Sequence, residues 1–283
     1  MNRPLNIALT GLAPMIWGSS YIVITQLLPD GYPLMSAAIR ALPAGLLLLL
    51  FSPKLPTGEW WWKTLVLGAL NFSVFWWLLF VAAYRLPGGV AATLGAMQPL
   101  IVVFAAFFIL NVPIRKVSIS SAILGIFGVA LLLLTAEAGF DLIGIIAGFG
   151  GAASMALGVV LTRKWQPPVP LLRFTAWQLI AGGLLLLPFA IALEPNFPAF
   201  TMNSLVGYGY LSIIGGALTY IIWFRGIATL DPNTISPLGF LSPLMAVLMG
   251  WLVLNQSLTY LQILGTAIVL LSIWLATRKP ADG

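Results

Sequence analysis

Long apolar segments alternate with short polar or proline-containing breaks along the whole chain. Each segment has about 20 residues, the length that an α-helix needs to cross the hydrocarbon core of a bilayer. The segments are continuously apolar and lack the alternation of barrel strands, so helices are preferred over a β-barrel. The pattern predicts an all-α integral membrane protein with ten transmembrane helices, at residues 6–27, 33–51, 64–84, 88–110, 117–136, 142–162, 170–193, 203–224, 232–254 and 260–277.

The first apolar segment follows a basic residue, Arg3, as the core of a signal peptide does. Its apolar run continues past Trp17 to Leu27, which is too long for a typical signal-peptide core, and no convincing small-residue cleavage site follows. We therefore expect this segment to be the first transmembrane span.

The composition excludes most other classes of protein. Of the 283 residues, 60% are hydrophobic and only 7% are charged, whereas a soluble domain carries about 25% charged residues. The chain has no Cys and no His, so it lacks thiol nucleophiles, thiolate metal sites and the most common proton shuttle. We expect no catalytic residues, no metal site, no cofactor and no nucleic-acid partner. The expected partners are the lipid bilayer and a small-molecule substrate.

The 13 Lys and Arg residues favour one orientation of the predicted spans. With the N-terminus inside, Arg85 lies outside, Arg40 lies within a span, and 11 residues lie at cytoplasmic ends: Arg3, Lys54, Lys63, Arg115, Lys116, Arg163, Lys164, Arg173, Arg225, Arg278 and Lys279. Basic residues accumulate on the cytoplasmic side of membrane proteins. We therefore predict a multi-pass protein of a bacterial-type inner membrane, with both termini in the cytoplasm.

The second half of the chain repeats features of the first half. An offset of 144 residues pairs Gly95 with Gly239 and Pro99 with Pro243, and it also pairs the Leu-Asn ends of the same spans. Coincidence between Gly- and Leu-rich sequences is the alternative, and the paired Gly-x-x-x-Pro elements favour duplication over it. Because each copy has five spans, an odd number, the second copy begins on the opposite side of the membrane and is inverted relative to the first. We predict two inverted five-helix repeats, residues 1–139 and 140–283, with a substrate site between them at the bilayer midplane.

Several stretches carry a resemblance to a known family. In the second half these are residues 217–226 (ALTYIIWFRG), 237–244 and 261–267, and in the first half they are Trp17-Gly18-Ser19-Ser20, Arg40, and residues 89–94 (GVAATL) leading to Pro99. They resemble the EamA repeat of the drug/metabolite transporter superfamily. The resemblance covers nearly the whole chain and implies a ten-helix exporter of metabolites, often amino acids, with a central cavity lined by both halves. It extends to the branch of aromatic amino-acid exporters.

The chain departs from this family at the ends of the fourth and ninth spans. The family often carries a Glu there, but this chain reads Asn111-Val112-Pro113 and Asn255-Gln256-Ser257. No role of that carboxylate can be transferred, and the pattern specifies the superfamily far better than the substrate.

Two prolines are predicted to bend the fourth and ninth spans. Pro99 and Pro243 cannot donate hydrogen bonds to the carbonyls of Gly95 and Gly239, which frees an acceptor for a substrate amine or for water. Side chains with hydrogen-bonding groups stand beside both bends, at Gln98 and Ser242. The alternative is that these residues only shape helix packing, and both interpretations are open.

Arg40 lies about eight residues into its predicted span, at a depth of about 12 Å. A charge at this depth indicates function by default, and a guanidinium suits a substrate carboxylate. The alternative, a structural arginine that pairs with backbone carbonyls, is the slightly stronger interpretation.

The other candidate substrate-binding residues are Trp17, Tyr21, Asn71, Tyr220 and Trp223. Trp17 and Tyr21 share a helix face, as do Tyr220 and Trp223, so each pair could form a cavity wall for a flat, apolar substrate. The alternative is that such aromatic residues contact lipid or lie at the interface.

The acidic residues bear on the transport mechanism. Every Asp and Glu falls in a break or at the end of a span, whereas proton relays usually need a carboxylate or His within the membrane. We predict an exporter of small amphipathic metabolites, above all amino acids with aromatic or bulky apolar side chains. It would work by alternating access, down the substrate gradient and without direct proton coupling.

Other functions remain as rivals. A proton- or cation-coupled multidrug exporter would need an intramembrane carboxylate, and a lipid-modifying enzyme would need a catalytic triad or clustered metal ligands, which the composition does not supply. A membrane anchor or receptor would have no use for polar residues and helix breakers at midspan. We expect a monomer, although the small residues of 144–151 could support helix contact within or between chains.

Overall fold

The computed structural model describes residues 2–86, 93–133, 141–255 and 257–278. Within these residues, ten helices are long and apolar enough to cross a membrane, which confirms the predicted fold class. The predicted span ends at 88–92 and 134–136 lie outside the described residues.

The first five spans are arranged as follows. They are α1 (Arg3–Leu27); α2 (Pro33–Phe51); a third span made of α3 (Trp60–Gly68), η1 (Ala69–Ser73) and α4 (Val74–Arg85); a fourth (Thr93–Leu110) that contains α6 (Gln98–Leu110); and α7 (Lys116–Leu133). The third helix begins four residues before the predicted start at 64 because Trp60, Trp61 and Trp62 form its first turn.

The last five spans begin with α8 (Leu142–Trp165) and α9 (Leu171–Leu193). The eighth span consists of α10 (Met202–Gly209), η2 (Tyr210–Leu218) and α11 (Thr219–Thr229), and the ninth of α12 (Pro232–Ile235), η3 (Ser236–Phe240) and α13 (Leu241–Leu254). The tenth is α14 (Tyr260–Thr277). The eighth helix runs five residues beyond the predicted end at 224.

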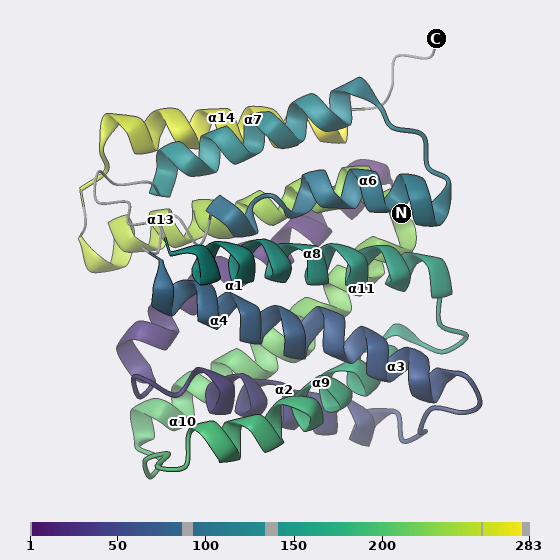
Figure 1. The fold of residues 1–283 in the computed structure, drawn as a ribbon, viewed down its shortest axis with the longest axis vertical. Coiled ribbons are helices and arrows are strands. Elements are labelled where there is room, and N and C mark those ends of the chain that lie inside the picture. Colours follow the sequence, from purple (N-terminus) through teal and green to yellow (C-terminus); the bar gives the residue numbers. More distant parts are fainter. Residues whose placement is uncertain (1, 87–92, 134–140, 256, 279–283) are drawn as a thin grey trace.

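The helices lie side by side, with α7 and α14 at one edge and α2, α9 and α10 at the other (Figure 1). We call the face at which α1 begins and α14 ends the terminal face, and the opposite face, which carries the loop at residues 28–32, the mouth face. Large apolar side chains such as Leu50, Phe108 and Met202 are exposed on the outside of the bundle, as expected for a surface that meets lipid.

Small residues bring the helices close together inside the bundle. On α8, Gly144 faces Leu86, and Gly148 faces Leu94, with almost no room for a Cβ at either position. The small residues that were predicted to support helix contact at 144–151 therefore contact other spans of the same chain.

The packing pattern bears on the predicted duplication. Helix α2 packs extensively on α9 and α7 on α14, α4 and α6 both pack on α8, and α11 and α13 both pack on α1. Exchanging the five spans of one half for those of the other leaves this set of pairs unchanged, as a two-fold relation between halves requires. The pairing supports two inverted repeats, which remain a proposal.

Matching irregularities occur in the two halves. The third and eighth spans both contain a π-helical segment, η1 and η2. The fourth and ninth spans both end at an Asn in the left-handed conformation, Asn111 with φ 56° and Asn255 with φ 53°. Asn tolerates this conformation better than most residues, which explains the repeated Leu-Asn ends of the sequence.

Candidate functional site

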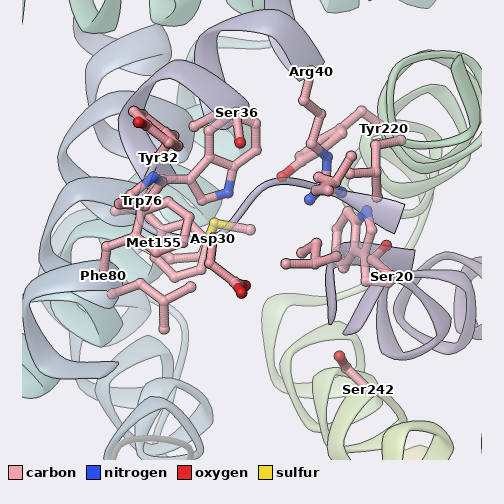
Figure 2. A pocket seen from close by; sticks show the side chains of 18 of the residues that line it. Ser20, Asp30, Tyr32, Ser36, Arg40, Trp76, Phe80, Met155, Tyr220 and Ser242 are labelled. Carbon is pink, nitrogen blue, oxygen red and sulfur yellow. The ribbon is translucent and has the colours of Figure 1, made fainter. Parts of the chain in front are cut away.

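A cavity of about 350 Å³ extends between the helices from mid-depth to the loop at residues 28–32 on the mouth face (Figure 2). Its volume lies within the range of about 300–1,000 Å³ typical of small-molecule sites. Residues from both halves of the chain line it, including Gln98 from the fourth span and Gly239 and Ser242 from the ninth.

The cavity has two chemically different sides. One carries aromatic and aliphatic side chains of α4 and α8, namely Phe75, Trp76, Leu79, Phe80 and Met155. The other carries polar groups of α1, α2 and α13, namely Ser20, Arg40 and Ser242, while Ser36 of α2 lies beside Trp76. Figure 2 shows Trp76, Phe80 and Met155 grouped apart from Arg40, Ser20 and Ser242. A cavity of this kind suits a ligand with one apolar and one polar end.

The carbonyl of Gly215 organises the polar side. It lies in the π-helical segment η2 and accepts hydrogen bonds from Arg40 Nη2 at 2.9 Å, Trp17 Nε1 at 3.1 Å and Thr219 Oγ1 at 2.6 Å. π-Helical segments recur at functional sites of proteins. Here one holds two side chains from α1 and α2 in place at the cavity.

Arg40 has contacts that fit both interpretations of its role. Its Nη2 donates to a backbone carbonyl, as a structural arginine would, while the residue also lines the cavity. Its guanidinium carbon lies 5.2 Å from the ring centre of Trp76, a cation–π distance. The guanidinium is thus held at the junction of the polar and aromatic sides.

Aromatic side chains form the floor of the cavity. Trp17 packs on Tyr220 at 4.9 Å and on Trp223 at 5.3 Å between ring centres, and Tyr220 also contacts Phe72 at 4.5 Å and Phe224 at 5.8 Å. We call these five residues the aromatic floor.

A second, smaller cavity of about 100 Å³ lies on the other side of this floor. It is lined by Phe174 and Phe224 and by residues at the ends of α8 and α11 on the terminal face, including Gln166 and Ala228. Phe174 contacts Phe224 with ring centres 5.3 Å apart. Aromatic packing therefore separates two hollows that lie toward opposite faces of the membrane.

The fourth and ninth spans are irregular at mid-depth, where the two prolines were predicted to bend them. In the fourth span, the amide of Met97 bonds to the carbonyl of Leu94 at 3.0 Å, a tight turn just before Pro99. In the ninth, η3 precedes Pro243, and the amide of Leu241 donates to the carbonyl of Gly239. That carbonyl therefore has a backbone partner in this conformation.

The two irregular segments approach each other. A Cβ on Gly239 would lie 4.0 Å from Gln98 Oε1, and the residue lines the cavity itself. Gly95 has open space around it and is not among the residues that line the cavity. A function of Gly95, Pro99, Gly239 and Pro243 as hinges stays a prediction.

The structure brings most of the predicted binding residues together at the cavity. The ones that line it are Trp17, Arg40, Gln98, Tyr220, Trp223 and Ser242. Asn71 is only 1% exposed and does not line the cavity; it lies in η1 of the third span and faces α8 and α9, where its Nδ2 donates to Gln178 Oε1 at 2.8 Å. The side chain of Tyr21 lies outside the described part of the structure.

Several lining residues are missed by the sequence analysis. Ser20 stands three residues after Trp17, and Ser36 stands four residues before Arg40, so helical spacing from the chosen residues would have found both. Trp76 and Phe80 share a face of α4 at the same spacing. Helical spacing could not have identified Asp30, because this residue lies in a loop.

Among the described residues, no three His, Cys, Asp or Glu side chains lie close enough together to hold a metal ion. In the part of the chain that the structure describes, ten helices of membrane-crossing length surround a cavity that both halves line, an arrangement typical of multi-pass membrane transporters.

Comparisons with known proteins place the chain in a family. The model of the EamA-like transporter family matches residues 5–134 and 142–278, which together span nearly the whole chain. The chain belongs to the EamA-like transporter family, within the drug/metabolite transporter superfamily.

Individual relatives agree with this assignment. The chain is 46% identical to Protein PecM of Dickeya dadantii (strain 3937), over 91% of this chain and 87% of that protein. It is 23% identical to a probable amino-acid metabolite efflux pump of Escherichia coli (strain K12), over 93% and 92% of the two chains. A solved crystal structure shares the fold, with a TM-score of 0.82, 18% identity and coverage of 98% and 99%.

Proposed function

We propose that the protein exports small amphipathic metabolites, above all amino acids with aromatic or bulky apolar side chains. The observation that carries this proposal is the division of the cavity into an aromatic side around Trp76 and a polar side around Arg40. A substrate ring would pack on the aromatic side, and its carboxylate would face the guanidinium. The similarity to a probable amino-acid metabolite efflux pump supports the same class of substrate.

The proposed mechanism is alternating access. The larger cavity lies toward the mouth face and the smaller one toward the terminal face, with the aromatic floor between them. Passage of a solute requires Tyr220 and Phe224 to separate from Trp17 and Phe174, which helix movement could produce. The family match to two segments and the pairing of the helices support two inverted repeats, residues 1–139 and 140–283. If each repeat adopted the conformation of the other, the cavity would close toward one face of the membrane and open toward the opposite face.

The proposed location is a bacterial-type inner membrane, with the terminal face in the cytoplasm. The charge distribution supports this orientation, since 10 of the 12 basic residues in the described part of the chain lie at the ends of spans on that face. The larger cavity would then face the outside, as expected for an exporter that is ready to release its substrate.

Transport is proposed to follow the substrate gradient without direct proton coupling. Among the described residues that line the cavity, Asp30 at the mouth is the carboxylate, and the mid-depth positions carry Ser, Gln and Arg. Reconstituted protein should therefore show the same initial flux of L-phenylalanine with and without a proton gradient. Substrate accumulation that depends on an imposed proton gradient would contradict this mechanism.

A second candidate, a cation-coupled exporter of drugs or metabolites, is favoured by one observation. Asp30 lines the cavity, so a negative charge does reach the route. A competition panel in proteoliposomes separates the candidates, with aromatic, aliphatic and lipophilic cationic compounds tested against labelled L-phenylalanine. We expect aromatic amino acids to compete best. Competition by the cationic compounds alone would favour the second candidate.

A further inference from the structure

Asp30 belongs to a loop that other contacts hold over the mouth of the cavity. The carboxylate of Glu194, at the end of α9, accepts hydrogen bonds from the amides of Leu34 at 2.9 Å and Met35 at 2.8 Å, in the first turn of α2. The Tyr32 hydroxyl donates to the carbonyl of Asn196 at 2.7 Å. The end of the loop that leads into α2 is therefore fixed to the end of α9 and to the segment that follows it.

Local backbone geometry also defines the loop. Gly31 has φ 85°, a left-handed conformation that residues with a Cβ rarely adopt, and Pro33 begins α2 with its ring at the first helical position. Asp30 immediately precedes this turn, and its carboxylate is directed into the cavity in Figure 2. Its position is therefore specified by the turn and by the contacts of Glu194 and Tyr32.

Asp30 and Arg40 are the charged side chains among the described residues that line the cavity, and they have opposite signs. They also lie at different depths. Arg40 is seven residues beyond Pro33, which places its backbone about 10 Å further along α2. A positive group at depth and a negative group at the mouth give the cavity a polarity along the direction of transport.

We propose that Asp30 is a specificity residue at the mouth that attracts the ammonium group of the substrate as it passes, while Arg40 faces its carboxylate deeper in the cavity. This inference rests on the proposed export of amino acids and makes it more specific, because it selects zwitterions over simple acids. Because both charged groups of an α-amino acid lie on one carbon, Asp30 and Arg40 act on it at successive depths of the cavity. An acid without an amine gains nothing from Asp30 and is repelled by it, by an amount that solvent screening keeps modest because Asp30 is exposed.

Three compounds with one ring and different charges test this inference: L-phenylalanine, 2-phenylethylamine and 3-phenylpropionate. The half-saturating concentration of each is measured in proteoliposomes for the parent protein and for Asp30→Asn. We expect the substitution to raise the value about fivefold for phenylalanine and phenylethylamine. The value for phenylpropionate should stay the same or fall.

Two further variants serve as controls. Asp30→Glu keeps the charge and should restore discrimination between the amine and the acid. Asp141→Asn neutralises a carboxylate of the same face that is not among the cavity-lining residues and caps α8 through the amide of Gly144. Since Asn is an equally good cap, this variant should behave like the parent for all three compounds.

The possible results separate this inference from the proposed function. If the parent transports phenylalanine but Asp30→Asn changes all three compounds equally, or none of them, the role of Asp30 is wrong and the function stands. If the parent moves none of the three compounds, the proposed substrate class is wrong, and the role of Asp30 falls with it.

Discussion

Replacing Arg40 by Met should raise the half-saturating concentration of L-phenylalanine about 10- to 100-fold. A hydrogen bond to a charged group contributes about 1.5–3 kcal/mol, and each 1.4 kcal/mol corresponds to about a tenfold change in affinity. Met retains much of the apolar length of Arg and can still pack against Trp76. The measurement is flux in proteoliposomes over a range of substrate concentrations.

The charge and the geometry of Arg40 can be separated with a second variant. Arg40→Lys keeps the positive charge but cannot bind a carboxylate through two parallel hydrogen bonds, so we expect an intermediate loss. The carbonyl of Gly215 keeps its bonds from Trp17 and Thr219 in both variants, which should preserve the fold. Parent-like flux of Arg40→Met would show that Arg40 is structural and that the carboxylate binds elsewhere.

Gly18→Ala should lower the stability of the protein by about 1–3 kcal/mol and reduce transport. A Cβ on Gly18 would lie 2.4 Å from the carbonyl oxygen of Ser242 and 2.6 Å from the Cβ of Met245 on α13. Both atoms belong to or adjoin the backbone, so α1 and α13 must move apart. That movement also displaces Trp17 from the contacts that hold the floor of the cavity. Thermal unfolding in detergent and flux in proteoliposomes measure the two effects.

Gly209→Ala is the matched control for this substitution. Gly209 lies in α10, where a Cβ would meet no other atom within 4 Å, and Ala has the higher helix propensity. Its unfolding temperature and flux should therefore equal or exceed those of the parent. If Gly18→Ala is as stable as this control, the close approach of α1 and α13 does not contribute to the stability of the protein.

The sequence was sufficient to predict the spans because the bilayer imposes a simple rule. A membrane-crossing helix needs an apolar run of a certain length, and each run of this chain is bounded by polar residues or proline. The errors lie at the ends, at Trp60 and at Thr229, where helices extend past the hydrocarbon region into the interface. Aromatic and polar residues are tolerated there, so hydrophobicity alone does not mark the helix end.

The candidate site was harder to predict, because hydrophobicity does not reveal which face of a helix meets a cavity. Aromatic residues and an intramembrane charge led to Trp17, Arg40 and Tyr220, all of which line it. The same reasoning selected Asn71, whose amide instead bonds to Gln178 in the packed interior. An isolated polar residue within a span satisfies its hydrogen bonds either in a cavity or against a neighbouring helix, and sequence alone does not decide between them.

Asp30 illustrates a different limit. The sequence places it in a break between two spans, where a charged residue is ordinary. Only the fold shows that this loop covers the mouth of the cavity and that Glu194, from the other half of the chain, holds the start of α2 beside it. Contacts between residues that are about 160 positions apart cannot be read from local patterns.

Labelling of a single introduced cysteine tests most directly whether the cavity is the route of the substrate. The chain has no Cys, so Ser242→Cys supplies the sole thiol in the cavity without further engineering. We expect a membrane-impermeant thiol reagent to label this residue from the mouth face, saturating L-phenylalanine to protect it, and labelling to stop transport. If substrate does not slow the labelling, and if the labelled protein still transports L-phenylalanine at the normal rate, the cavity is not the route of the substrate.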